Sequence, residues 1–296
     1  MDFGGMEAGA MNGVRVPNSS GTAGPKLKTP AHACDCHMHI YDGARFPPSR
    51  PGARMQPDGA VNDYRLLQQR TGTSRTVVVT PAAYVTDNDV TLDAIAQLGP
   101  DNTRGVAVVH PDVTDAELKR LDAGGIRGIR FTQFDPHTAA TTRDMIEPLA
   151  RRVEPLGWHV QIHLRSDQIA DAADLLQRLP GTVVFDHLGR LAGGVNDPAF
   201  AIIRRMLDRG RTWVKLSGAY FFGEAPGYAG ALPIARAYVD AAPGRVVWGS
   251  DWPHPTEAEK PDDAVLLDLL ANWAPDDATR HRILVNNPIA LYGFAR

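Results

Sequence analysis

Residues 76–109, TVVVTPAAYVTDNDVTLDAIAQLGPDNTRGVAVV, contain the unit from which the fold of this chain can be inferred. The segment begins with a short β-branched run, Thr76–Thr80, and ends with another, Arg104–Val109. Between them, Thr91–Leu98 has the apolar spacing of a helix, and Gly99 is a typical residue at a helix C-terminus. Val77–Val79 is apolar on both faces, as in parallel strands covered on two sides. The segment therefore predicts a strand–helix–strand unit of a parallel α/β fold.

This unit recurs along the chain. Eight β-branched runs alternate with helical segments, at His32–Ile40, Thr76–Thr80, Arg104–Val109, Gly128–Thr132, His159–Leu164, Thr182–His187, Thr212–Ser217 and Val246–Asp251. Helical spacing also occupies Ile169–Leu179, and Thr114 is expected to cap a helix that begins at Asp115. Eight such pairs match a (β/α)8 TIM barrel, which we predict as a single α/β domain over residues 32–296. A doubly wound open sheet is the alternative, but no glycine-rich phosphate loop follows the first run.

The composition limits the possible classes of function. The chain of 296 residues is 43% apolar and 22% charged, so it can bury a full core. Its 31 basic and 34 acidic side chains give a net charge of −3, which offers no electrostatic case for nucleic acid or an anionic membrane. No apolar stretch approaches membrane-spanning length. Cys34 and Cys36 are too close along the chain to form a disulfide, and this suits a reducing cytoplasm, where we expect the protein to act.

The first residues differ in character from the rest. Met1–Ala31 is rich in Gly, Ser, Ala and Pro and has no continuous apolar segment of the kind that a secretory signal needs. We predict a flexible or loosely draped extension, and we assign it no function.

Polar side chains gather where the predicted strands end. In a TIM barrel these carboxyl ends face a common mouth. His37 and His39 stand two residues apart on the first run, and therefore on one face of a strand. Asp251 ends the last run, and the others supply Arg130, His163, Asp186, His187, Arg190, Lys215 and Ser217. Two imidazoles and a carboxylate can build either a divalent metal site or a polar proton-transfer site.

Some of these residues also have plain structural interpretations. Asp186 can be a turn or supporting residue beside His187. Arg130 and Arg190 can bind a substrate anion, or they can be solvated or ion-paired. Lys215 is expected to point into the barrel and to pair with an acid, because an unpaired buried ammonium is costly. His254 is expected to shape the last loop rather than to take part in chemistry.

Several motifs resemble the amidohydrolase superfamily. They are DCHMH at 35–39, GIRGIRF at 125–131, DHLGR at 186–190, WGSDWPHP at 248–255 and VNNP at 285–288. The chain is similar in particular to the branch that contains 2-pyrone-4,6-dicarboxylate lactonase and related lactone hydrolases. The resemblance runs from about Ala31 to Tyr292 and implies a TIM barrel. It also implies a divalent metal, expected to be zinc, held by His37, His39, His163 and Asp251.

The chain departs from the pattern of that lactonase in three places. The lactonase is thought to work without metal and has a tyrosine where this chain has His163, so this histidine favours metal dependence here. Pro81–Tyr84 and Phe134–His137 stand where the lactonase has a polar segment and a Lys-Arg pair. The loss of cationic contacts argues against pyrone dicarboxylate as the particular substrate.

The resemblance implies hydrolysis of a small carboxylated lactone of the muconolactone, pyrone or sugar-acid type. In this scheme Asp251 is the base that activates water and His187 polarises the carbonyl, while Arg130 and Arg190 hold the substrate carboxylate. Metal-free catalysis by the same residues, lactone isomerisation, metal-dependent decarboxylation and a non-catalytic binding barrel remain as alternatives. Because the isomerase of this branch lacks the histidine that this chain keeps as His37, hydrolysis is favoured. No pattern indicates the oligomeric state.

Overall fold

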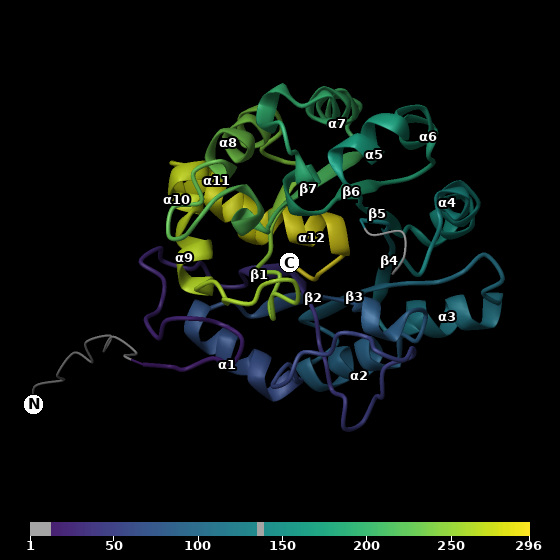
Figure 1. The fold of residues 1–296 in the computed structure, drawn as a ribbon, viewed down its shortest axis with the longest axis horizontal. Coiled ribbons are helices and arrows are strands. Elements are labelled where there is room, and N and C mark those ends of the chain that lie inside the picture. The colour runs from purple at the N-terminus through teal and green to yellow at the C-terminus, as the bar shows by residue number, and fades with distance from the viewer. Residues whose placement is uncertain (1–12, 135–138) are drawn as a thin grey trace, which may run out of the picture.

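The computed structural model describes residues 13–134 and 139–296 and confirms the TIM barrel (Figure 1). Eight strands form one sheet in sequence order, and each is parallel to the next. They are β1 Cys34–Met38, β2 Arg75–Val79, β3 Thr103–Ala107, β4 Ile126–Thr132, β5 His159–His163, β6 Val183–Phe185, β7 Thr212–Leu216 and β8 Val246–Trp248.

Helices surround the strands, as Figure 1 shows. They are α1 Val61–Thr71, α2 Asp89–Leu98, α3 Asp115–Ala123, α4 Ile146–Val153, α5 Ser166–Asp171, α6 Ala173–Arg178, α7 Pro198–Asp208, α8 Ala231–Ala241, α9 Asp263–Asp268, α10 Leu270–Trp273, α11 Asp277–His281 and α12 Asn287–Tyr292. Because helices cover the outer face and side chains fill the inner one, strand residues such as Val77, Val78 and Val79 are completely buried. Thr114 caps α3 by accepting a hydrogen bond from the Glu117 amide.

The barrel closes where the end of β8 meets β1. The Asp251 amide donates to the His37 carbonyl at 2.7 Å, and the Ser250 amide donates to the Asp35 carboxylate at 2.9 Å. Gly249 permits this close approach, because a Cβ atom there would lie 2.8 Å from the His37 nitrogen. The joint brings the first and last motifs of the sequence into contact.

Six of the eight observed strands are shorter than the predicted runs, whereas β2 is as long as predicted and β4 is longer. The difference matters at the mouth of the barrel. β6 ends at Phe185 and β8 at Trp248, so His187 and Asp251 lie in turns beyond the strands. Both have left-handed backbones, with φ of 50° and 67°. Such conformations are costly for residues other than glycine and persist only when the surroundings hold them, most often at functional sites. The predicted helix Ile169–Leu179 is two helices, α5 and α6, interrupted at Ala172.

Residues 13–31 of the predicted extension lie against the barrel. Val16 is buried, and the Pro17 carbonyl accepts a hydrogen bond from the Trp252 indole at 2.8 Å. Arg70 of α1 donates to the Gly21 carbonyl, and Asp268 of α9 accepts from the Leu27 amide. This part of the chain is therefore draped over α1, α9 and the last loop rather than loose. Residues 1–12 lie outside the described residues.

The opposite, amino-terminal end of the barrel is covered by the C-terminal segment. Tyr292 and Phe294 pack in one cluster with Cys34 and Trp213, and the Arg75 guanidinium lies 5.3 Å from the centre of the Phe294 ring. The described part of the chain thus leaves the carboxyl end of the barrel open for a site. Within residues 13–134 and 139–296, no helix combines the length and apolarity required to cross a bilayer.

Candidate active site

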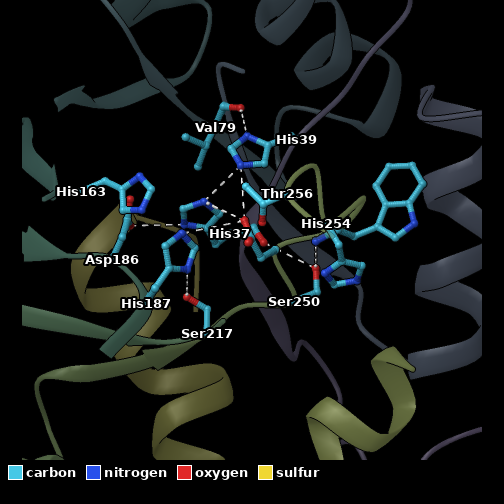
Figure 2. Close-up of polar contacts among 12 residues, drawn as sticks. His37, His39, Val79, His163, Asp186, His187, Ser217, Ser250, His254 and Thr256 are labelled. Carbon is cyan, nitrogen blue, oxygen red and sulfur yellow. Dashed lines mark hydrogen bonds and ion pairs between the residues drawn. The ribbon is translucent and has the colours of Figure 1, made fainter. Parts of the chain in front are cut away.

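Several of the polar side chains predicted at the strand ends line one cavity of about 590 Å³ at the carboxyl end of the barrel. Its lining includes His39, Arg130, His163, His187 and Asp251. These side chains come from five different strands or the turns that follow them, so the parallel topology is what brings them together. Figure 2 shows the histidine rings turned toward one another in the middle of this group.

Three of the residues form the centre of the site. The Nε2 atoms of His37 and His39 lie 3.3 Å apart, and each lies 3.4 Å from Asp251 Oδ1. His39 Nδ1 lies 2.7 Å from the Val79 carbonyl, which can only accept, so the ring proton is on Nδ1 and a lone pair is on Nε2. His37 Nδ1 lies 3.3 Å from the Asp186 carboxylate, an acceptor, and 3.3 Å from Lys215 Nζ, a donor, so these two contacts hold the ring in place without fixing its tautomer.

This geometry suits a divalent cation. The Nε2 atoms of His37 and His39 and one carboxylate oxygen of Asp251 converge, and all three ligand atoms lie within 4.8 Å of one another. Each imidazole is oriented by a contact at its other nitrogen, with the Val79 carbonyl for His39 and with Asp186 and Lys215 for His37, as is usual for metal-ligating histidines. The donor set of His37, His39 and Asp251 therefore fits the metal that the resemblance implies.

The protonation states agree with this arrangement. Burial lowers the pKa of His37 well below its ordinary value and lowers that of His187 to about 4. Burial alone would raise the pKa of Asp251, but His187, His39 and His37 outweigh it and hold the pKa well below its ordinary value. At neutral pH His37 and His187 are therefore neutral, and the Asp251 carboxylate beside them is ionised.

Asp186 contacts His37 from inside the barrel and helps to orient its ring. Its carboxylate accepts from Arg130 Nε at 2.8 Å and from Gln161 at 3.0 Å, and it lies 3.8 Å from Lys215 Nζ. Lys215 also donates to the Cys36 carbonyl at 2.9 Å. The acid that the sequence leads us to expect beside Lys215 is thus Asp186, and burial lowers the pKa of this lysine to about 8. A single buried carboxylate orients His37 and balances two cations.

His163 is not brought into the central group of His37, His39 and Asp251. Its Nδ1 lies 3.2 Å from Arg130 Nη2, and a guanidinium can only donate, so Nδ1 accepts and Nε2 carries the proton. Within residues 13–134 and 139–296, this Nε2 has no hydrogen-bond partner, although it is buried. In this arrangement His163 offers its Nε2–H to the cavity as a hydrogen-bond donor.

The two arginines expected to bind substrate occupy different environments. Arg130 lines the cavity, but it is held by Asp186 and His163. The Arg190 guanidinium lies between the rings of Phe221 and Phe134, 3.5 Å and 4.2 Å from their centres. It lines a neighbouring cavity of about 750 Å³ instead. Of the predicted segment Phe134–His137, only Phe134 belongs to the described residues.

Sequence reasoning missed other residues of the site. Arg50 and Arg54, from the long connection between β1 and α1, line the same cavity as His163 and His187. Tyr220 donates a hydrogen bond to Asp251 Oδ2. Arg50 and Arg54 could have been predicted from the sequence, because every connection that follows a strand of a TIM barrel lies at the mouth of the barrel. No sequence signal pointed to Tyr220.

Comparison with known proteins agrees with the geometry. Residues 34–294 match the model of the amidohydrolase family. The chain is 34% identical to 2-pyrone-4,6-dicarboxylate hydrolase of Comamonas testosteroni, an alignment covering 90% of this chain and 92% of that one. It is 35% identical to 4-sulfomuconolactone hydrolase of Rhizobium radiobacter, covering 89% and 91%. It is 33% identical to D-galactarolactone isomerase of Agrobacterium fabrum, covering 94% and 96%. With a family match over nearly the whole barrel and His37, His39 and Asp251 at its mouth, the chain belongs to the amidohydrolase family.

Proposed function

We propose that the protein is a hydrolase that opens a small lactone carrying an anionic group. The proposal depends above all on the ionised Asp251 carboxylate. Its Oδ1 lies 3.4 Å from the Nε2 atoms of His37 and His39, at the wall of a cavity that arginines also line. Relatives that are 34% and 35% identical are hydrolases of a pyrone dicarboxylate and a sulfomuconolactone, whose names specify a lactone-type ring with acidic substituents. Arg50 and Arg54 supply cationic groups for such substituents.

We propose that His37, His39 and Asp251 hold a divalent metal, and that this metal is zinc. When bound, it would lower the pKa of water and polarise the ester carbonyl. His163, a metal ligand in our sequence-based prediction, is now assigned a different role. Its Nε2–H can donate to a substrate oxygen within the cavity.

The remaining catalytic roles are assigned to side chains of the protein. Asp251 accepts the proton of the attacking water as the new carbon–oxygen bond forms. When the ring carbon–oxygen bond breaks, the same carboxylate returns that proton to the leaving oxygen, so the product is an open-chain hydroxy or keto acid. His187, whose Nδ1 lies 2.9 Å from the Ser217 hydroxyl, donates from Nε2 to the carbonyl oxygen as negative charge develops. Arg130 positions His163 and shares in binding the anion.

Lactone isomerisation is the second candidate, because the relative that is 33% identical over 94% of the chain is an isomerase. The acyl group would then move between two hydroxyl groups of one substrate without net addition of water. We further propose that the protein acts in the cytoplasm on a small molecule, without nucleic-acid or membrane partners. Its cysteines are free and buried, and its net charge is −3.

The test is a panel of anionic lactones, including pyrone, muconolactone and sugar-acid types, assayed with chelator-treated protein reloaded with Zn²⁺. Reactions in water enriched in ¹⁸O should place one heavy oxygen atom in the product carboxylate and release one acid per turnover. Isomerisation would change the substrate without incorporation of ¹⁸O. Release of carbon dioxide would indicate a decarboxylase, and absence of turnover across the panel in every metal form would refute the proposal.

A further inference from the structure

The two oxygens of Asp251 have different partners. Oδ1 faces the Nε2 atoms of His37 and His39, whereas Oδ2 accepts a hydrogen bond from the Tyr220 hydroxyl. Tyr220 lies in the short 3-10 turn Ala219–Phe222 that follows β7. In the described part of the chain, the residues that line the 590 Å³ cavity do not include Tyr220. Tyr220 therefore reaches the reacting centre only through Asp251.

Behind Tyr220 the contacts continue into the protein. His254 Nδ1 lies 3.4 Å from the Tyr220 hydroxyl, and His254 Nε2 lies 3.2 Å from both oxygens of Asp263, the first residue of α9. His254 and Asp263 are fully buried. The row Asp251–Tyr220–His254–Asp263 thus links the candidate catalytic carboxylate to a second carboxylate that does not line the cavity.

Counting hydrogens gives the direction of two of these bonds. The Tyr220 hydroxyl has one hydrogen, and the ionised Asp251 can only accept, so this hydrogen goes to Asp251. His254 Nε2 donates to the Asp263 carboxylate, which can only accept, and the other ring nitrogen, Nδ1, lies 3.4 Å from the Tyr220 oxygen. Asp263 therefore holds the His254 ring in place behind the Tyr220 hydroxyl.

The backbone fixes Asp251 and His254, the first and third members of this row, relative to each other. Asp251 and His254 both have positive φ, 67° and 53°, and the His254 amide donates to the Asp251 carbonyl at 2.8 Å. This tight turn directs the Asp251 side chain to the centre and the His254 ring toward Tyr220. The turn itself does not fix the rotation of the Asp251 carboxylate plane about the Cβ–Cγ bond, and this rotation decides whether an oxygen points at His37 and His39.

We propose that Tyr220, His254 and Asp263 form a positioning chain that fixes the Asp251 carboxylate with one oxygen facing His37 and His39. The inference rests on the proposed function, in which Asp251 accepts and returns a proton at that centre. Because the chain acts through Asp251 and does not line the cavity, its loss should lower kcat and leave KM nearly unchanged.

The kinetic test uses Tyr220→Phe, Asp263→Asn and the double variant, with Tyr292→Phe as control. The Tyr292 hydroxyl is buried and has no hydrogen-bond partner among residues 13–134 and 139–296. A hydrogen bond to a charged group contributes about 1.5–3 kcal/mol, so Tyr220→Phe should reduce kcat about 10- to 100-fold. The double variant should equal Tyr220→Phe, because Asp263 has no route to Asp251 without the hydroxyl. Additive losses, or losses confined to KM, would overturn the proposal, and Tyr292→Phe should retain the wild-type kcat.

A crystallographic test does not depend on knowing the substrate. In the wild-type protein the Asp251 carboxylate should have one orientation, and in Tyr220→Phe it should rotate or occupy two. An unchanged single orientation in Tyr220→Phe would overturn the inference even if the enzyme is a lactonase. Conversely, inactivity on all lactones would refute the proposed function and leave this structural result to decide the inference. Tyr220→Phe is nearly isosteric, so it keeps the test available if Asp263→Asn fails to fold.

Discussion

The replacement Asp251→Asn should abolish most turnover while the protein stays folded. The asparagine can keep the contacts that position residue 251, because its amide oxygen still accepts from Tyr220 and its backbone amide still donates to the His37 carbonyl. Its side-chain NH₂ group would then occupy the position of Oδ1, 3.4 Å from the Nε2 atoms of His37 and His39. It can donate there, but it can neither ligate a cation nor accept a proton.

The expected magnitudes follow from these contacts. Loss of a general base alone costs a factor of about 10²–10⁴ in rate, equivalent to about 3–5 kcal/mol in the barrier. The free energy of unfolding of the metal-free protein should change by about 1 kcal/mol or less, because a hydrogen-bonded buried group replaces another. The stabilisation that Zn²⁺ gives to wild type should be lost.

The assay combines three measurements on Asp251→Asn, wild type and the control Asp277→Asn, whose side chain is 96% exposed. They are kcat on the best lactone of the panel, the urea midpoint of the chelator-treated protein, and metal content after reloading. A folded Asp251→Asn protein with kcat within tenfold of wild type would refute the role of this carboxylate. The control should match wild type in all three.

Three further outcomes are expected. Arg130→Met removes a partner of the fully buried Asp186 and should lower the free energy of unfolding, measured in urea, by about 3–5 kcal/mol. A decrease below about 1 kcal/mol would show that Asp186 does not need this cation. Burial lowers the pKa of His159 from 6.5 to about 3, so the unfolded chain binds a proton that the folded chain does not, and stability is lost as pH falls below 6.5. Between pH 6.5 and about 4.5 the loss due to His159 should reach about 2 kcal/mol in urea unfolding, and His159→Phe should remove it whereas the exposed His281→Gln should not. Zn²⁺ at about one hundred times its Kd should stabilise the chelator-treated protein by about 2.7 kcal/mol, and thermal unfolding of His39→Gln should show no such shift if His39 is a ligand.

The sequence by itself determined the barrel and the centre of its site. Runs that are apolar on both faces, such as Val77–Val79, can only be buried between two layers, and eight of them in alternation with helices predict the TIM barrel. Once the strands are parallel, their carboxyl ends meet at one mouth. His37 and His39 could therefore be placed beside Asp251, although Asp251 lies more than 200 residues further along the chain.

Only the tertiary structure decided how each polar group is used. His163 stands at the expected strand end, yet Arg130 fixes its tautomer and keeps it out of the central group. Arg190 lies between two aromatic rings in a neighbouring cavity, and Tyr220 contacts Asp251 from a turn with no sequence signal. The physical reason is that periodicity specifies which face of an element is buried. Hydrogen-bond partners depend instead on side-chain rotation and on turns with positive φ, which packing across the whole barrel determines.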